Sequence, residues 1–408
     1  MYKISFNQIY SIVFVHTNYF VHIQFINRSD LMKKTLINAR YMIAPLLILS
    51  AVFGVIAGGP WVWTGVFMLG LGIIVDTLTR NQTPGAGFDE NGSTYASASM
   101  QNGVMYGMLG AFVLLQIVLA WRVWEYAMGI PVSQTSLLGL SIQEGITTTQ
   151  LIGACLSSGI FAGIGIIYGH ELAHTKGFSF VLARWMMALS GKAHFCYAHV
   201  YNHHLELGHQ DDPATSPRGR SIYKHFPLSG IGQSKFLFKM EKQRLERLGK
   251  PFLTWQNRWI RGYLMSIPTV ALFWFAGGWI GMAALSTLWI IANFELEALN
   301  YLEHYGLIRE KGQPIDYRHS WDNSTAFTSW FFIEIGRQAD HHDRGETHFW
   351  ELDEVGAPNC GRGYFSLFAL TLIPSIWQRY IGEQLDKWDN EMASEGELKI
   401  AEELKVAA

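Results

Sequence analysis

The feature that most constrains this chain is a series of apolar windows that contain almost no charge. Each window is about 18 to 20 residues long, the length at which a helix crosses about 30 Å of hydrocarbon. The predicted spans are residues 42–58, 61–79, 103–121, 150–168, 262–277 and 279–298. Glycine and proline at 58–60, and Gly277 with Gly278, interrupt the first and last pairs, which predicts tight helical hairpins. We therefore expect an all-α fold, a bundle of six transmembrane helices.

The distribution of positive charge predicts the orientation of this bundle. Residues 171–261 contain fourteen lysines and arginines, whereas the connection between the third and fourth spans contains only Arg122. Loops rich in Lys and Arg stay on the cytosolic side of a membrane. We expect a multi-pass protein of the bacterial inner membrane, with both termini and a histidine-rich cap in the cytosol. Two shorter apolar segments, 178–191 and 364–381, are predicted to form interfacial or re-entrant helices, and Pro374 breaks the second.

Composition suggests three regions and argues against one class of partner. Residues 1–31 lack a clean apolar segment, and Met32 begins a basic stretch just before the first span, so residues 1–31 are predicted to be an upstream extension. Residues 32–383 are expected to form the membrane domain and 384–408 a charged cytosolic tail. The net charge of −2, without a basic patch, argues against a nucleic-acid partner. The three cysteines show no CxxC spacing, which fits a reducing cytosol.

Histidines provide the strongest functional signal. Eight of the fifteen fall into four groups: His170 and His174 in HELAH, His199, His203 and His204 in HVYNHH, His304 in NYLEHYG, and His341 and His342 in QADHH. Helical residues four apart share a face, so His170 with His174, and His199 with His203, can each offer two imidazoles to one metal ion. His203 and His204 diverge by about 100° on a helix, which allows them to serve two different ions. The eight histidines are the predicted metal ligands.

Imidazole ligands alone do not select the metal, since they suit Zn, Cu, Fe and Ni. We expect the carboxylates of Glu171, Glu303 and Asp340 to accept hydrogen bonds from the ligand rings and orient them. HELAH also fits the HExxH motif of a zinc membrane protease, with Glu171 as the general base, but that function leaves the remaining histidine groups unexplained. A transporter with incidental histidines is disfavoured because the groups gather at one membrane face. Near the end of the second span, Asp76 is either a functional carboxylate or a solvated anchor of the helix end.

The segments HELAHTK, HVYNHH and NYLEHYGL resemble the histidine motifs of the membrane-bound alkane hydroxylase and xylene monooxygenase family, relatives of the membrane fatty acid desaturases. The resemblance runs from about Met32 to the tail. The segments RGRSIY, LIPSIWQ and LDKWDNE look closer to the xylene monooxygenase hydroxylase component, the branch similar to methyl hydroxylases of xylene and p-cymene.

This resemblance implies a monooxygenase with a non-haem di-iron centre that uses O2. The implied reaction is hydroxylation of a terminal or benzylic methyl group to the primary alcohol, on an alkylbenzene such as xylene or p-cymene, or on an n-alkane. Electrons would come from a separate protein, either an iron-sulfur flavoprotein reductase or rubredoxin with its reductase. A lipid acyl desaturase is the alternative, which the NYLEHYG motif disfavours.

One departure from the family pattern concerns the third histidine box. The family has HxxHH, whereas Gln338 takes the first position here, giving QADHH. Either the Gln338 oxygen is a weak ligand, or His319 or His348 replaces the missing histidine, or one metal ion has one ligand fewer.

Overall fold

A computed structural model describes residues 11–17, 20–26, 28–89 and 92–407 of the chain. The longer helices are α1 (Arg28–Arg40), α2 (Ile43–Ala57), α3 (Thr64–Leu78), α4 (Ala98–Ala127), α5 (Thr148–Ala173), α6 (Phe178–Leu189), α9 (Ile222–Arg247), α11 (Ile267–His304), α15 (Pro374–Glu391) and α16 (Glu395–Ala407). The short helices are η1 (Gly59–Trp63), α7 (Phe195–Ala198), η2 (His199–His203), α8 (His204–Glu206), α10 (Arg258–Leu264), η3 (Tyr317–His319), α12 (Ala326–Phe331), α13 (Gln338–Asp343), η4 (Phe349–Glu351) and α14 (Tyr364–Thr371).

Two small antiparallel hairpins depart from the all-α prediction. They are formed by β1 (Ser11–Thr17) with β2 (Phe20–Ile26), and by β3 (Ser133–Leu137) with β4 (Leu140–Glu144). In the second hairpin Leu138 and Gly139 both have positive φ, of 52° and 81°. This is the backbone of a two-residue turn whose twist matches that of the paired strands. The prediction that residues 1–31 are an upstream extension falls partly outside the described residues and stays a prediction.

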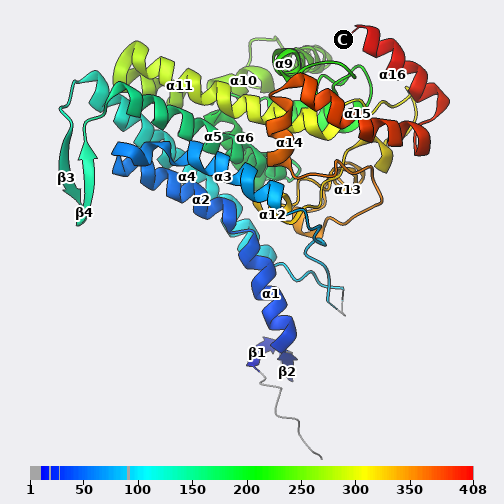
Figure 1. Cartoon of the computed structure of the whole chain (residues 1–408), viewed down its shortest axis with the longest axis horizontal. Helices are drawn as coiled ribbons and strands as arrows, with labels where there is room; N and C mark the ends of the chain where they lie inside the picture. Colours follow the sequence, from blue (N-terminus) through cyan, green and yellow to red (C-terminus); the bar gives the residue numbers. More distant parts are fainter. Residues whose placement is uncertain (1–10, 18–19, 27, 90–91, 408) are drawn as a thin grey trace, which may run out of the picture.

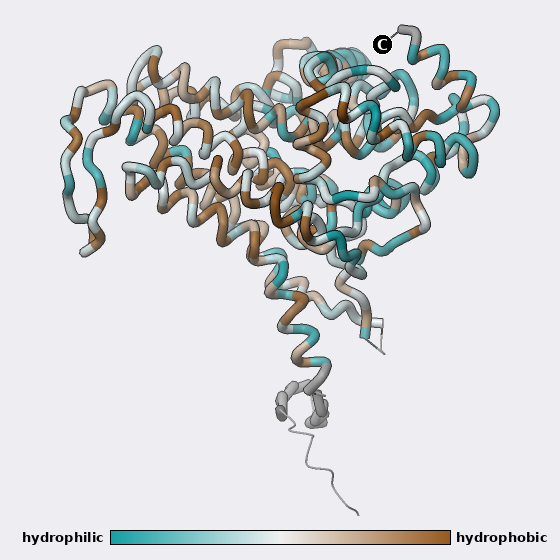
Figure 2. The backbone as a smooth tube through the Cα atoms, viewed as in Figure 1, coloured by the Kyte–Doolittle hydropathy of each residue, from teal (hydrophilic) through white to brown (hydrophobic). Residues whose placement is uncertain are grey.

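The helices divide the molecule into an apolar body and a polar end. Helices α2, α3, α4, α5 and α11 run side by side, with the β3–β4 hairpin at one end of the stack (Figure 1). Helices α9, α13, α15 and α16 gather at the other end (Figure 1). Apolar residues follow the stacked helices, and polar residues dominate the end that carries α13, α15 and α16 (Figure 2). The apolar body is therefore the part suited to a bilayer.

Helix α5 lies at the centre of this body. It packs against α2, α3, α4, α6 and α11, and nearly all of its residues from Leu151 onward are buried. Glycines allow its neighbours to come close, since a Cβ added at Gly165 would lie 2.6 Å from the Phe112 ring and one at Gly159 would lie 2.8 Å from Ile291. Small residues at helix contacts are the usual means of close packing inside a membrane.

Among the described residues, four helices are long and apolar enough to cross a membrane, or five if the bent pair α1–α2 counts as one span. The sequence prediction of six differs because its last two spans lie within one helical stretch, Arg258–His304. That stretch breaks at Gly277 and Gly278, where the backbone is not helical, as predicted. A Cβ at Gly281 would lie only 1.8 Å from the carbonyl oxygen of Phe273, so the chain folds back at the glycines.

The end of α4 shows why the third predicted span was too short. The prediction stopped at residue 121 because Arg122 is charged, but α4 continues to Ala127 with Arg122 fully buried. Its guanidinium donates to the carbonyl oxygens of Val55, at 2.8 Å, and Ile56, at 2.7 Å, and pairs with Glu125 at 2.5 Å. A buried cation with this many partners is tolerated, and it fastens the end of α2 to α4.

The two segments predicted to lie at the membrane interface form helices in the structure, and Asp76 contacts the second of them. Residues 178–189 form α6, which packs against α4 and α5, and the second segment divides into α14 and α15 just before Pro374, as predicted. Asp76 is buried and accepts hydrogen bonds from Thr328 Oγ1 at 3.0 Å and from the Ser366 amide and hydroxyl at 2.9 and 2.8 Å. Asp76 is therefore an anchor of the helix end rather than a solvated residue.

Candidate metal centre

The eight predicted histidines meet where the long apolar helices end. His170 lies in the last turn of α5, His174 directly follows it, and His304 ends α11. The others come from η2, α8 and α13 at the polar end of the molecule. Helices α5 and α11 thus each deliver a histidine to the same place, and the short helices of the polar end supply the others.

The first group consists of His170, His174, His199 and His341, whose candidate ligand nitrogens all lie within 4.8 Å of one another. The Nε2 atoms of His174 and His199 are 3.1 Å apart. The imidazole rings of His170 and His199 lie 4.3 Å apart between centroids, and those of His174 and His341 lie 4.5 Å apart. Four converging imidazoles are enough to hold one metal ion.

The second group consists of His203, His304 and His342, whose nitrogens satisfy the same 4.8 Å limit. The His203 ring centroid is 4.7 Å from that of His304 and 4.9 Å from that of His342. His204 lies between the groups, with its ring 4.4 Å from His342 and 4.6 Å from His174. All eight predicted residues therefore belong to one cluster with two centres.

A local π-helical turn decides how the HVYNHH motif is divided. Residues His199–His203 form the π-helical segment η2, in which residues five apart are brought together. His199 and His204 therefore lie close, with Nε2 atoms 3.1 Å apart, and His203 faces the second group. The expected pairing of His199 with His203 on one ion was wrong, because it assumed regular α-helical spacing. The expected divergence of His203 and His204 is present, with ring planes at 88°.

The cluster is buried and short of hydrogen-bond partners, which is the condition that a metal ion would relieve. Both ring nitrogens of His304 and of His342, and Nε2 of His341, are buried without a hydrogen-bond partner among the described residues. Leaving buried polar atoms unpaired costs about 1–3 kcal/mol each. Burial and the neighbouring imidazoles hold the pKa values of His199 and His204 well below the ordinary value. The rings are thus neutral at pH 7, the form that binds metal. The residues fit a metal centre.

A carboxylate that the sequence analysis missed orients one of these rings. Asp212 Oδ2 lies 2.8 Å from Nδ1 of His203, and it also accepts a hydrogen bond from the Thr215 hydroxyl at 2.7 Å. Burial alone would raise the pKa of Asp212, but His203, Thr215 and the Ala214 amide together lower it. Asp212 is therefore ionised and fixes the proton of His203 on Nδ1, leaving Nε2 free for a metal. Its position eight residues after the HH pair was the signal available in the sequence.

The three predicted orienting carboxylates have other hydrogen-bond partners. Asp340 is held by Arg344, with Nε to Oδ1 at 2.6 Å, and accepts from the Asp353 amide at 2.7 Å. Glu171 Oε1 accepts from the Phe349 amide at 3.0 Å. Glu303 contacts the side chains of Tyr364 and Gln338. None of these hydrogen bonds joins a carboxylate to a ligand ring, and the expectation that the three orient the histidine rings stays a prediction.

The structure also places the three residues considered for the missing ligand of the third box. The Gln338 amide group donates to the Ile335 carbonyl oxygen at 2.7 Å and lies beside Glu303. His319 pairs with Glu397 at 3.0 Å and belongs to neither histidine group. His348 stacks on Trp350, with ring centroids 4.4 Å apart, and Glu171 raises its pKa. Neither alternative histidine joins the cluster.

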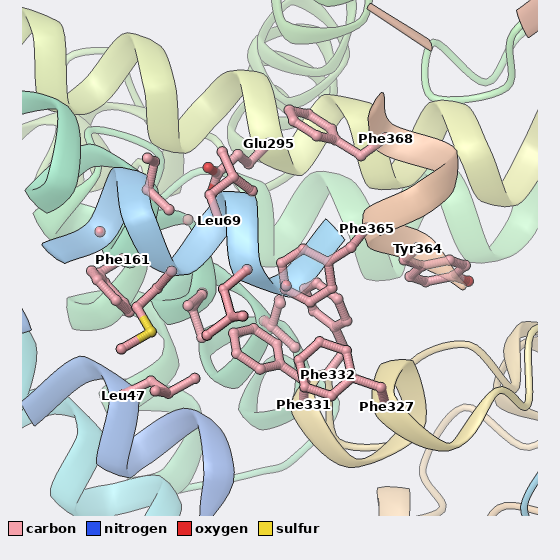
Figure 3. A pocket seen from close by; sticks show the side chains of 18 of the residues that line it. Leu47, Leu69, Phe161, Glu295, Phe327, Phe331, Phe332, Tyr364, Phe365 and Phe368 are labelled. Atoms are coloured by element: carbon pink, nitrogen blue, oxygen red, sulfur yellow. The ribbon is translucent and has the colours of Figure 1, made fainter. Parts of the chain in front are cut away.

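An apolar cavity of about 270 Å³ lies beside the cluster, between α3, α5, α11, α12 and α14. Five phenylalanines form much of its wall near α12 and α14: Phe327, Phe331, Phe332, Phe365 and Phe368 (Figure 3). Ile167 lines both this cavity and a small gap next to His170 and His341. The cavity lies within the apolar body, and Ile167 is the lining residue that it shares with the gap beside the histidines.

The fold and the site define a multi-pass, helical membrane protein with a buried polyhistidine cluster. HELAH as the site of a zinc protease is disfavoured, because His170 and His174 share their group with two further histidines. A family model described as fatty acid desaturase matches residues 147–370, more than half of the chain, and includes all eight histidines. The chain belongs to the fatty acid desaturase family.

Within this family, the chain is similar to curated alkane and xylene monooxygenases. Alkane 1-monooxygenase 1 of Pseudomonas aeruginosa is 31% identical over 56% of this chain and 62% of its own length. Alkane 1-monooxygenase of Acinetobacter baylyi is 30% identical over 56% of this chain and 58% of its own length. The xylene/toluene monooxygenase hydroxylase component of Pseudomonas putida is 27% identical over 89% of this chain and 93% of its own length. The chain thus spans about three fifths of the alkane enzymes and nearly all of the xylene enzyme. The resemblance to the alkane hydroxylase and xylene monooxygenase family is confirmed.

Proposed function

We propose that this protein is a membrane monooxygenase that hydroxylates a methyl group of a hydrophobic hydrocarbon to the primary alcohol. The observation that carries the proposal is two groups of histidines near an apolar cavity, which shares the lining residue Ile167 with a gap beside His170 and His341. The printed functions of the relatives, on alkanes and on xylene or toluene, agree with an apolar substrate. The overall reaction is R–CH3 + O2 + 2 e⁻ + 2 H⁺ → R–CH2OH + H2O.

The proposed centre holds two iron ions. His170, His174, His199 and His341 would bind one ion, His203, His304 and His342 the other, and His204 lies within reach of either. Bound iron would supply the activation of O2, which the side chains cannot perform alone. Gln338 remains a proposed weak ligand, since its amide nitrogen is engaged and only its oxygen is available.

The protein's own residues would position the substrate and keep water away. The phenylalanine wall and Ile167 surround a hydrocarbon on its way to the centre, so the methyl group reaches the histidines without passing through solvent. Excluding water limits side reactions at a reactive site. Asp212 holds the His203 ring in one tautomer throughout.

We also propose the setting in which the reaction takes place. The bundle crosses the bacterial inner membrane six times, because the chain folds back at Gly277 and Gly278, and the histidine-rich cap faces the cytosol. The electrons come from a separate protein, an iron-sulfur flavoprotein reductase or rubredoxin with its reductase. The turnover test below, with p-xylene and octane, distinguishes an alkylbenzene substrate from an n-alkane substrate.

Metal analysis combined with turnover tests this function. We expect about two irons per purified chain, and loss of iron in His203→Ala and His304→Ala, because each removes a ligand of the second group. With a supplied electron donor, p-xylene or octane should give the primary alcohol. Exposed Glu383, changed to Gln, is the control that should keep both iron and activity. One zinc per chain, or an alkene as the product, would overturn the proposal.

A further inference from the structure

The apolar cavity is lined by one half-buried acidic side chain that the reaction does not require. Of the described residues that line the cavity, Glu295 of α11 alone carries a carboxyl group. None of the described residues forms a hydrogen bond or ion pair with it. The side chain lies between α11 and α3, close to Leu69 (Figure 3). The Glu295 carboxyl group faces the cavity with no hydrogen-bond or ion-pair partner among the described residues.

An unpartnered carboxyl group in this position is costly, and the neighbouring helix makes room for it. Transfer of an unpaired polar group from water to an apolar environment is unfavourable. Gly163 of α5 provides the space, since a Cβ there would lie 1.8 Å from Glu295 Oε2. Ionisable groups at membrane depth usually serve binding or transport. A ligand group that pairs with Glu295 would recover the cost.

The distance along the helices places Glu295 far from the metal centre. Gly163, which touches the carboxyl group, precedes His170 by seven residues of α5, or about 10 Å at 1.5 Å per residue. Glu295 precedes His304 by nine residues of α11, or about 14 Å on the same scale. The carboxyl group therefore lies along the wall of the apolar cavity, about 10 to 14 Å along the helices from the histidines.

We propose that the cavity takes a medium-chain hydrocarbon that carries a hydroxyl group at the end remote from the reacting methyl, and that Glu295 accepts the hydrogen bond from this hydroxyl. This inference rests on the proposed function and names its substrate class. The preferred substrate is a primary alkanol, and the product is the α,ω-diol. A methyl C–H bond breaks, a C–O bond forms with one oxygen atom of O2, and the other atom leaves as water. The two electrons come from the same external electron-transfer protein.

The test compares decan-1-ol with decane and with decyl methyl ether, which has the oxygen atom but no hydroxyl hydrogen. We expect kcat/KM for decan-1-ol to exceed that for decane and for the ether by about tenfold, the scale of a lost hydrogen bond in a buried site. Glu295→Leu should remove this preference while decane turnover remains, and Glu295→Gln, which still accepts a hydrogen bond, should keep part of it.

Two control variants distinguish the effect of the Glu295 carboxyl group from two other effects. One changes the shape of the cavity, and the other removes a charge elsewhere on the protein. Leu299→Ala, one turn further along the same wall, should change kcat/KM for decan-1-ol and decane by the same factor. Exposed Glu383, changed to Gln, should leave the preference as it is. An unchanged preference in Glu295→Leu would overturn the inference.

Ligand binding without turnover distinguishes failure of this inference from failure of the proposed function. Under nitrogen and without an electron donor, decan-1-ol should raise the Tm of the iron-loaded wild type more than decane does, and this difference should vanish in Glu295→Leu. A Glu295-dependent shift without any hydroxylation would support the pocket and refute the monooxygenase. Hydroxylation of decane with equal Tm shifts for both ligands would support the monooxygenase and refute the hydroxyl-binding role of Glu295.

Discussion

Asp212 illustrates how a single side chain outside the histidine motifs can control the centre. It is buried, ionised and hydrogen-bonded to His203, so its negative charge acts on the second histidine group through the His203 ring. Orienting partners of this kind strengthen a ligand and fix its tautomer. The neighbouring Asp211 instead faces His209, at 3.3 Å, and Lys311, at 3.7 Å, on the exposed surface.

This contrast gives a matched pair of variants. Asp212→Asn should weaken iron affinity by about 10- to 100-fold, because the amide keeps the size but loses the charge that holds the Nδ1 proton. Asp211→Asn should bind iron as the wild type does. Competition with a chelator of known affinity measures both constants. Equal affinities for the two variants would show that Asp212 has no part in metal binding.

At the scale of the secondary-structure elements, two local irregularities shape the protein. The π-helical turn η2 rotates His203 away from His199 and so distributes one motif over two histidine groups. The break at Gly277 and Gly278 turns α11 back on itself, which allows its second arm to pack along α5 and end at His304. Gly278 has φ of 55° and ψ of −125°, a conformation that strains residues with a Cβ.

The hairpin predicts the effect of small substitutions. Gly278→Ala should lower the free energy of unfolding by about 1–3 kcal/mol because of backbone strain. Gly281→Ala should also destabilise, since its Cβ would meet the Phe273 carbonyl. Gly107→Ala, in the middle of α4 with open space around it, should be neutral or slightly stabilising. Thermal unfolding in mild detergent measures all three, and a stable Gly278→Ala would contradict the tight turn.

At the scale of the whole molecule, the two ends of the apolar body differ in character. The β3–β4 hairpin lies at one end, and the polar helices that cover the histidines lie at the other (Figures 1 and 2). If the apolar body spans the membrane, these ends face opposite compartments. The basic residues of 171–261 then keep the histidine end in the cytosol.

Labelling in intact cells tests this orientation. Ser136→Cys, exposed near the hairpin turn, should react with a membrane-impermeant maleimide, whereas Glu383→Cys, exposed on α15, should react only after the cells are broken. The native cysteines Cys155, Cys196 and Cys360 are buried, so their background should be low. Labelling of Glu383→Cys alone in intact cells would reverse the orientation.

The sequence by itself determined the features that depend on local pattern. Charge-free windows predicted the apolar helices, and glycine and proline predicted the breaks at Gly277–Gly278 and Pro374. The grouping of histidines in HELAH, HVYNHH, NYLEHYG and QADHH selected the eight that the structure brings together. These follow from backbone length, dihedral freedom and helical periodicity, which each segment carries alone.

Only the tertiary structure decided which groups meet across the chain. A turn brings Asp212 to His203. Asp340 instead accepts a hydrogen bond from Arg344, and Glu171 accepts one from the Phe349 amide. Arg122 can be buried within α4 because it donates hydrogen bonds to carbonyl oxygens of α2. Glu295 becomes a cavity residue only because Gly163, distant in sequence, leaves room beside it. Hydrogen bonds and free volume of this kind depend on the packing of several helices, and no single segment encodes them.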